Sequence, residues 1–191
     1  MNMNRDLTAV SREKGMKVLK MIWGAMIFSV GIYAAIALVV QMDPGNVSSV
    51  PLVAALAAIS GGLFFTQVKL HQNLDDENLF PRILDLGSWG LKPEVAEQLK
   101  TLQMPERGVQ LILQAHVVFS IVIWAMAEAV AVFGLVLSLI TGERHLMGIF
   151  GSVALIQLLW FRPRDRAFDE QLERWGKYVQ TGRGRVQSLD S

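Results

Sequence analysis

The chain has 191 residues, of which 52% are hydrophobic and only 18% are charged, and its mean hydropathy is +0.36. Soluble domains carry about 45–50% apolar and about 25% charged residues, so these values exclude an ordinary water-soluble globule and a disordered chain. The 18 Lys and Arg nearly balance the 17 Asp and Glu, and the net charge of +1 does not point to a nucleic-acid partner. Because cysteine is absent, disulfides, thiolate nucleophiles and iron–sulfur ligands are excluded as well.

Four apolar blocks follow one another along the chain: residues 21–40, 50–68, 117–140 and 146–161. A membrane-spanning helix needs roughly 20 such residues, with a range of about 17–25. The fourth block is the shortest, so we expect Trp160 and Arg162 beside it to anchor it at the membrane interface. The sequence therefore predicts an all-α, polytopic membrane protein with four transmembrane helices.

The basic residues orient these four helices. All but one of the 18 Lys and Arg lie in residues 1–20, 69–108 and 162–191, and Arg144 alone lies in the turn between the third and fourth blocks. Basic residues collect on the cytoplasmic side of membrane proteins. We therefore expect both termini and the central loop in the cytoplasm, and the protein in the cytoplasmic (inner) membrane.

The segments outside the membrane carry helix patterns of their own. We divide the chain into a basic N-terminal segment (1–20), two spans (21–68), a cytoplasmic helical loop (69–108), two further spans (109–161) and an amphipathic helix with a basic tail (162–191). Short helices are predicted over 73–80 and from Pro93 to residue 102. A helix over 165–180 places one apolar stripe on a single face: Phe168, Leu172, Trp175 and Val179. These helices form a small cytoplasmic cap or lie on the membrane surface, and residues 181–185 are expected to be a flexible basic tail.

Glu128 is the one acidic or basic residue inside the four blocks, and it lies at the middle of the third. An acid at the centre of a bilayer costs at least about 2.5–3.5 kcal/mol. Desolvation disfavours the charged form, so we expect the carboxyl to be protonated at rest. Four hydroxyl residues reach a similar depth and are the candidate partners in an ion-binding site: Ser29, Tyr33, Ser60 and Ser152. Such an acid either takes up and releases a proton or ties helices together as a neutral hydrogen-bonding group.

Small residues surround Glu128 on its own helix: Ala125, Ala127, Ala129, Ala131 and Gly134. The second span carries a similar set: Ala54, Ala57, Ala58, Gly61 and Gly62. Small residues let helices in membranes approach closely, so these two spans are predicted to pack against each other. Trp124 lies one turn from Glu128, where its indole either shields the carboxyl or faces lipid.

The run from Glu128 to Val136 (Glu-Ala-Val-Ala-Val-Phe-Gly-Leu-Val) resembles the second helix of the c subunit, or proteolipid, of rotary ATP synthases. In that family an ion-binding carboxylate is followed by alanine and then by an aromatic-Gly-Leu-Val run at the same spacing. The resemblance implies that Glu128 carries a proton or a sodium ion. It also implies that residues 50–68 form the inner helix of a ring, so that the partner is a further copy of the chain.

The sequence shows no Gly-rich phosphate loop, no HExxH and no Ser/His/Asp arrangement, so we expect no enzymatic activity and no cofactor. His71 and His116 have no fixed metal-ligand spacing, so no metal site is predicted. Three functions stay open: an ion-binding or ion-translocating subunit that uses Glu128, a non-catalytic structural subunit of a larger membrane complex, and a transporter that acts alone. Membrane lipids, further copies of the chain or other subunits are the expected partners, and no nucleic acid is expected.

Overall fold

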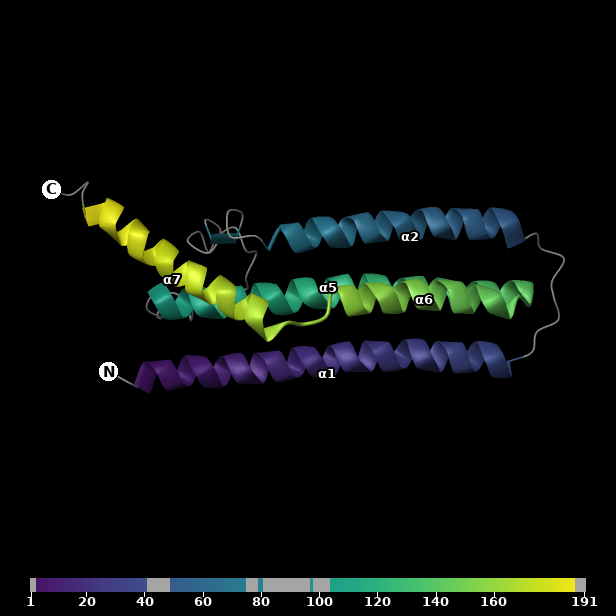
Figure 1. Cartoon of the computed structure of the whole chain (residues 1–191), viewed down its shortest axis with the longest axis horizontal. Helices are drawn as coiled ribbons and strands as arrows, with labels where there is room; N and C mark the ends of the chain where they lie inside the picture. The colour runs from purple at the N-terminus through teal and green to yellow at the C-terminus, as the bar shows by residue number, and fades with distance from the viewer. Residues whose placement is uncertain (1–2, 41–48, 75–78, 81–96, 98–103, 188–191) are drawn as a thin grey trace. The chain divides into compact units, whose positions relative to one another are not determined.

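The computed structural model describes residues 3–40, 49–74, 79–80, 97 and 104–187. Five helices account for most of this part of the chain: α1 (Met3–Val39), α2 (Ser49–Gln72), α5 (Met104–Thr141), α6 (Arg144–Trp160) and α7 (Asp165–Gln187) (Figure 1). These described ranges contain no β-strand. The predicted all-α fold class is therefore confirmed for them.

The chain divides into two compact units. The first, here called the bundle unit, comprises Val18–His71 and Phe119–Pro163. The second, here called the cap unit, comprises Met1–Lys17, Gln72–Val118 and Arg164–Ser191. Helices α1 and α5 contribute residues to both units, because each is longer than the apolar block that it contains.

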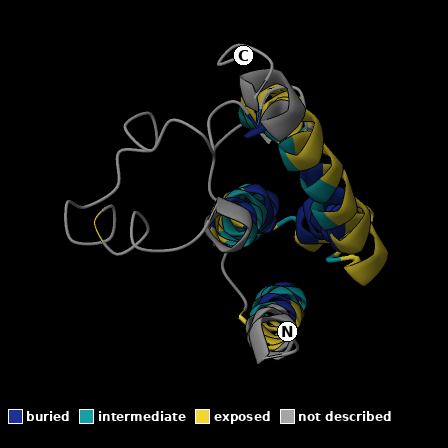
Figure 2. Ribbon diagram, turned by 90° about the vertical axis from the view of Figure 1, so that its left-hand side faces the viewer, coloured by how far each residue is buried: buried dark blue, intermediate teal, exposed yellow. Residues whose placement is uncertain are grey.

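The bundle unit consists of helices that alternate in direction and lie side by side (Figure 1). From Ile123 to Thr141, buried residues recur along α5 every three or four positions, as expected for a helix with one face toward its neighbours. Figure 2 shows buried residues in dark blue on the helices seen end-on. A tight turn joins α5 to α6 at Gly142, whose φ of 73° is a conformation that glycine adopts without a steric penalty. The Ser138 hydroxyl closes this turn, because it donates to the Glu143 carbonyl at 3.2 Å and accepts from the Met147 amide at 2.8 Å.

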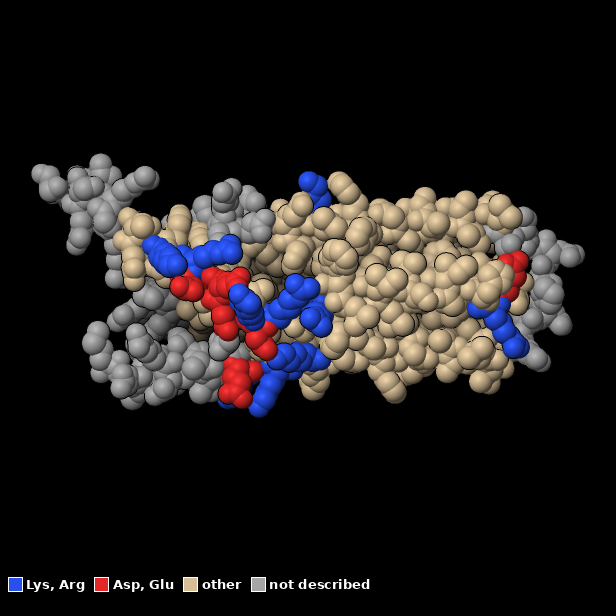
Figure 3. Space-filling model, viewed as in Figure 1, with Lys and Arg blue, Asp and Glu red and all other residues tan. Residues whose placement is uncertain are grey.

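Three helical segments are long and apolar enough to cross a membrane: Glu13–Val39, Val50–Gln72 and Gly108–Thr141. Helix α6 has 17 residues and counts as a fourth candidate only when it is taken together with the helix that follows it. On the side of the bundle unit drawn in Figure 3, no acidic or basic side chain interrupts the surface over the middle of its helices. Helix length and composition thus indicate a multi-pass, membrane-embedded helical protein.

The cap unit is organised around one face of α7. Two residues of the apolar stripe predicted for this helix, Phe168 and Trp175, are buried. The Phe168 ring packs edge-on against His116 of α5, with ring centroids 5.4 Å apart, and Trp175 packs in the same way against Phe80 at 5.4 Å. The Gln171 amide donates to the Leu74 carbonyl at 2.6 Å. The apolar face of α7 therefore packs against other helical segments of the cap unit.

Two predictions for the segments outside the spans differ from the structure or fall outside its description. Helix α7 continues to Gln187, so the prediction of a flexible tail over residues 181–185 is wrong. The Thr181 hydroxyl bonds back to its own helix there, with its one proton shared between the Lys177 and Tyr178 carbonyls at 3.1 and 3.0 Å. The helix predicted from Pro93 to residue 102 lies outside the described residues apart from Glu97, which is helical. Half of the helix predicted over 73–80, residues 75–78, also lies outside them.

Candidate functional site

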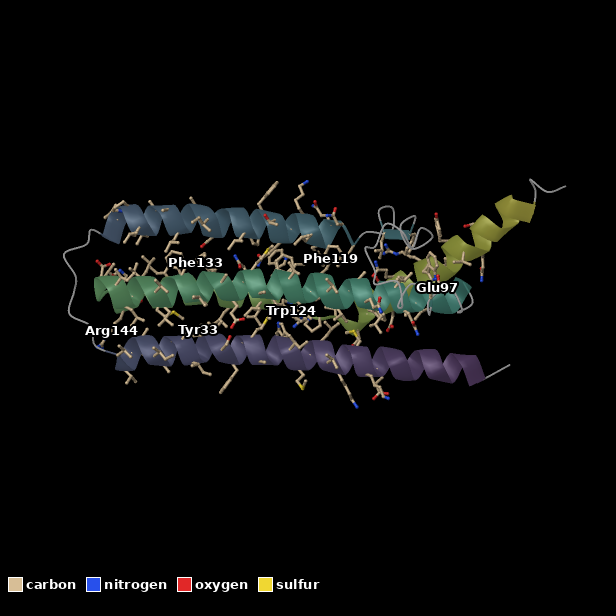
Figure 4. All side chains as sticks on the ribbon, turned by 180° about the vertical axis from the view of Figure 1, so that it is seen from behind. Tyr33, Glu97, Phe119, Trp124, Phe133 and Arg144 are labelled. Carbon is tan, nitrogen blue, oxygen red and sulfur yellow. The ribbon has the colours of Figure 1, made fainter. Side chains whose placement is uncertain are left out.

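The Glu128 carboxyl is held by two hydroxyl groups of α1. Ser29 Oγ donates to Glu128 Oε1 at 2.7 Å, and the Tyr33 hydroxyl donates to the same oxygen at 2.8 Å. Ser29 and Tyr33 lie one helical turn apart, so both reach the same point on α5, and Figure 4 shows Tyr33 on the side of α1 that faces α5. All three side chains are half-buried. The structure thus brings together Glu128 and two of its four predicted partners.

The other two predicted partners do not join this site. The Ser60 hydroxyl donates to the Leu56 carbonyl at 2.7 Å, and the Ser152 hydroxyl donates to the Gly148 carbonyl at 2.7 Å. Each therefore bonds within its own helix, as serine in a membrane helix commonly does. The inclusion of Ser60 and Ser152 as partners of Glu128 is wrong, because equal depth does not place two side chains on facing sides of their helices.

Three of the small residues around Glu128, Ala127, Ala131 and Gly134, are buried, and Gly134 lies at the contact between α5 and α6. A Cβ atom added at Gly134 would lie 2.6 Å from Phe150 Cβ, so the two helices meet there with no room for a side chain. Ala127 and Ala131 of α5 and Ala154 of α6 are fully buried. A close helix approach was predicted for this part of α5, and α6 is the helix that makes it.

The predicted close packing of the small face of α2 against α5 is wrong. Added Cβ atoms at Gly61 and Gly62 would meet nothing within 4 Å, and the three alanines of this face are exposed. Phe119 and Phe133 point from α5 toward α2 (Figure 4). Large side chains of α5 therefore lie on the side of this helix that faces α2.

Trp124 is fully buried, so its indole does not face lipid. Its indole nitrogen donates to the carbonyl of Phe161, just after the end of α6, at 2.8 Å. Trp23 of α1 makes a similar bond to the Leu158 carbonyl at 2.8 Å. Both tryptophans thus tie neighbouring helices to the C-terminal end of α6, and both satisfy carbonyls that lack a partner within that helix.

Two buried glutamines form a second polar contact that the sequence reasoning missed. Gln67 of α2 is fully buried, and its amide nitrogen donates to the Ile123 carbonyl of α5 at 2.9 Å and to Gln157 Oε1 of α6 at 3.4 Å. Gln67 Oε1 is buried and accepts no hydrogen bond from the described residues. The signal was present in the sequence, since amide side chains inside apolar spans commonly bond across helices.

Metal binding finds no support among the described residues, which contain no group of three or more His, Asp and Glu side chains able to hold a metal ion. The polar groups at Glu128 are one carboxyl and two hydroxyls. The second oxygen of the Glu128 carboxyl, Oε2, accepts no hydrogen bond within the part of the chain that the structure describes. The site can therefore hold a proton and leaves one carboxyl oxygen open.

Comparisons of the chain with protein-family models, with curated proteins and with solved structures find no match. The similarity of the Glu128 helix to the c subunit therefore remains a resemblance of sequence.

Proposed function

We propose that this chain crosses the inner membrane four times, with both termini in the cytoplasm, and that it binds and releases a proton at Glu128. The length and composition of the helices and the position of the basic residues support the membrane placement. The observation that carries the proton site is the position of the Ser29 hydroxyl between two acceptors.

The Ser29 hydroxyl has one proton and two acceptors within hydrogen-bond distance. Its Oγ lies 2.8 Å from the Met26 carbonyl oxygen and 2.7 Å from Glu128 Oε1. When Glu128 is charged, Ser29 donates to the carboxylate. When Glu128 is protonated, the acid donates to Ser29 Oγ and Ser29 donates to the Met26 carbonyl. Both states keep these groups hydrogen-bonded at the same distances, so a proton can enter or leave without a movement of the helices.

The hydroxyl groups favour a proton over a sodium ion. A hard cation takes oxygen lone pairs as ligands. The Tyr33 O–H points at Glu128 Oε1, and Ser29 does so as well when the carboxyl is charged. Hydroxyl protons therefore occupy Oε1, and the one open carboxyl oxygen, Oε2, supplies fewer ligands than a hard cation takes.

A second surface is expected to cover Glu128 in the working assembly. The carboxyl is half-buried, and Ala125 and Val136 nearby on α5 are exposed. A proton that crosses the membrane needs a path from each side, and the described residues bond to only one of the two carboxyl oxygens. We expect a further copy of this chain or another subunit to supply the missing surface, and the native mass in mild detergent distinguishes these assemblies from a monomer.

Glu128→Gln tests the proposal. The amide oxygen of glutamine can accept the bonds from Ser29 and Tyr33 in place of Oε1, so we expect the variant to fold. A hydrophobic carbodiimide enters the lipid and attacks a protonated carboxyl. We expect it to label the wild type at Glu128 and to leave the variant unlabelled there, and we expect proton-dependent activity to be lost with Glu128→Gln.

Ser29→Ala is a second test of the proposal, and Ser152→Ala is its matched control, because the Ser152 hydroxyl donates within its own helix. We expect only Ser29→Ala to change the rate of carbodiimide labelling at Glu128, by several-fold. A wild-type-like Glu128→Gln strain, or the same labelling rate in both serine variants, would end the proton-carrier proposal. Glu128 would then be an acid that ties α1 to α5, as a structural subunit requires.

A further inference from the structure

A groove runs between α2 and α6 in the bundle unit, with a cavity volume of about 450 Å³. Exposed apolar residues form most of its walls: Ala57, Gly61 and Phe64 on α2, and Ile149, Val153 and Ile156 on α6. The groove is therefore open along one side, and in a bilayer that side faces hydrocarbon. It exists because α2 is held to α6 through Gln67 and Gln157 at one end, while its small residues leave space along the rest.

One polar side chain of this apolar groove has donors to spare. Gln157 lines the groove and is only 4% exposed. Its Oε1 accepts from Gln67 Nε2 at 3.4 Å, and this is its only side-chain hydrogen bond within the described residues. The amide nitrogen Nε2 makes no hydrogen bond among the described residues, so its two N–H groups are available to a ligand in the groove. A polar group without a partner is costly in hydrocarbon, and a ligand with an acceptor oxygen removes that cost.

We propose that the groove binds an acyl chain of a phospholipid, whose ester carbonyl accepts a hydrogen bond from Gln157 Nε2. The depth of Gln157 fits this ligand. Trp160 is 69% exposed, which is typical of a residue at the membrane interface, and Gln157 lies about 4.5 Å deeper along α6. Ester carbonyls lie at this boundary between headgroups and hydrocarbon. The groove then continues to Ile149, about 12 Å farther along the helix, where the acyl chain lies.

Charge at the mouth of the groove favours an anionic phospholipid. Arg162 is exposed and follows Phe161, whose ring packs against His71 of α2 with ring centroids 5.5 Å apart. Phe161 also contacts Phe64, a wall residue of the groove, at 6.5 Å. Arg162 thus follows directly on a residue that contacts the groove wall, and its long side chain can reach the level where the lipid phosphate is expected.

A helix from a second copy of the chain fits this groove less well than a lipid does. The backbone acceptors of a membrane helix are already bonded within that helix. An apolar helix face would therefore cover Gln157 Nε2 without offering it a partner. A phospholipid supplies both the apolar chain and the carbonyl oxygen.

Native mass spectrometry of the full chain in mild detergent tests this proposal. The probes are phosphatidylglycerol with ester-linked chains and its analogue with ether-linked chains, which has no carbonyl. We expect the wild type to bind the ester lipid about three- to tenfold more tightly, the worth of roughly one hydrogen bond. Gln157→Leu should bind the two lipids equally. The comparison of lipids on the wild type remains decisive if Gln157→Leu fails to fold.

Gly61→Leu and Gly62→Leu supply the matched control. A Cβ at either glycine meets nothing within 4 Å, but only Gly61 lines the groove. We expect Gly61→Leu to lower the affinity for the ester lipid several-fold and Gly62→Leu to leave it unchanged. Equal affinity of the wild type for both lipids, or equal effects of the two glycine variants, would overturn the proposal. The proposal would also be overturned if the chain forms a dimer that Gly61→Leu abolishes and that added lipid does not change. A second copy of the chain would then occupy the groove.

Discussion

Gly134→Ala probes the contact that brings α6 against the Glu128 helix. The new Cβ would lie 2.6 Å from Phe150 Cβ and 3.4 Å from the Leu146 carbonyl oxygen and Met147 Cα. Phe150 Cβ is attached directly to the α6 backbone, so a change of rotamer cannot move it away and the helix itself has to shift. Overpacking of this kind costs about 1–3 kcal/mol of stability.

Gly148→Ala is the matched control, because a Cβ at Gly148 of α6 meets nothing within 4 Å. Both variants gain about 0.8–1.0 kcal/mol from the higher helix propensity of alanine, and this gain cancels when they are compared. The expected difference is the clash alone, about 1–3 kcal/mol. At about 2–4 °C per kcal/mol for a chain of this size, Gly134→Ala should unfold several degrees below Gly148→Ala.

Thermal unfolding in mild detergent, followed by tryptophan fluorescence, measures this difference in Tm. Equal Tm values for the two variants would refute the reasoning, because α6 would then not lie against Gly134. A loss of stability in Gly148→Ala as large as that in Gly134→Ala would refute it equally, since the cost would come from something other than this contact.

Two further predictions concern the cap unit and the topology. Gly108→Ala should lower the Tm by several degrees, because a methyl group at Gly108 overlaps the buried indole of Trp175. Gly176→Ala should not lower it, because a methyl group at Gly176 meets nothing within 4 Å. Similar Tm values for the two variants would contradict the packing of α7. Since the chain has no cysteine, Arg144→Cys should react with an impermeant maleimide added outside intact cells and Lys177→Cys only after permeabilisation, and the reverse pattern would invert the proposed topology.

The helices were the most predictable part of the fold. An apolar block of about 20 residues is required by the thickness of a bilayer, so α1, α2 and α5 each contain a predicted block. The helix ends were less predictable, because polar residues before a block can continue the helix, as α1 does from Met3 and α5 from Met104. Helix α7 also continues past its predicted end, through residues 181–185, where the low helix propensity of two glycines favoured a tail.

The candidate site was predictable in depth but not in direction. Depth follows from the position of a residue along its span, and it correctly selected Ser29 and Tyr33 as partners of Glu128. Which side of a helix faces which neighbour depends on how the helices are arranged around one another, and the sequence of a single chain leaves this open. Ser60 and Ser152 were for that reason wrongly included.

Packing within one chain accounts for most of the run that resembles the c subunit. Gly134 makes room for Phe150 of α6, Phe133 points toward α2, and Ala131 is fully buried. These residues would be needed whether or not further copies surround the chain. Glu128 differs, because no packing requirement calls for an acid where an apolar residue would be less costly in a membrane. Its two hydroxyl donors, and the choice of acceptors open to Ser29, are what a proton site needs, and they lie within a single chain. The proposed proton binding at Glu128 therefore does not require that the assembly be a ring.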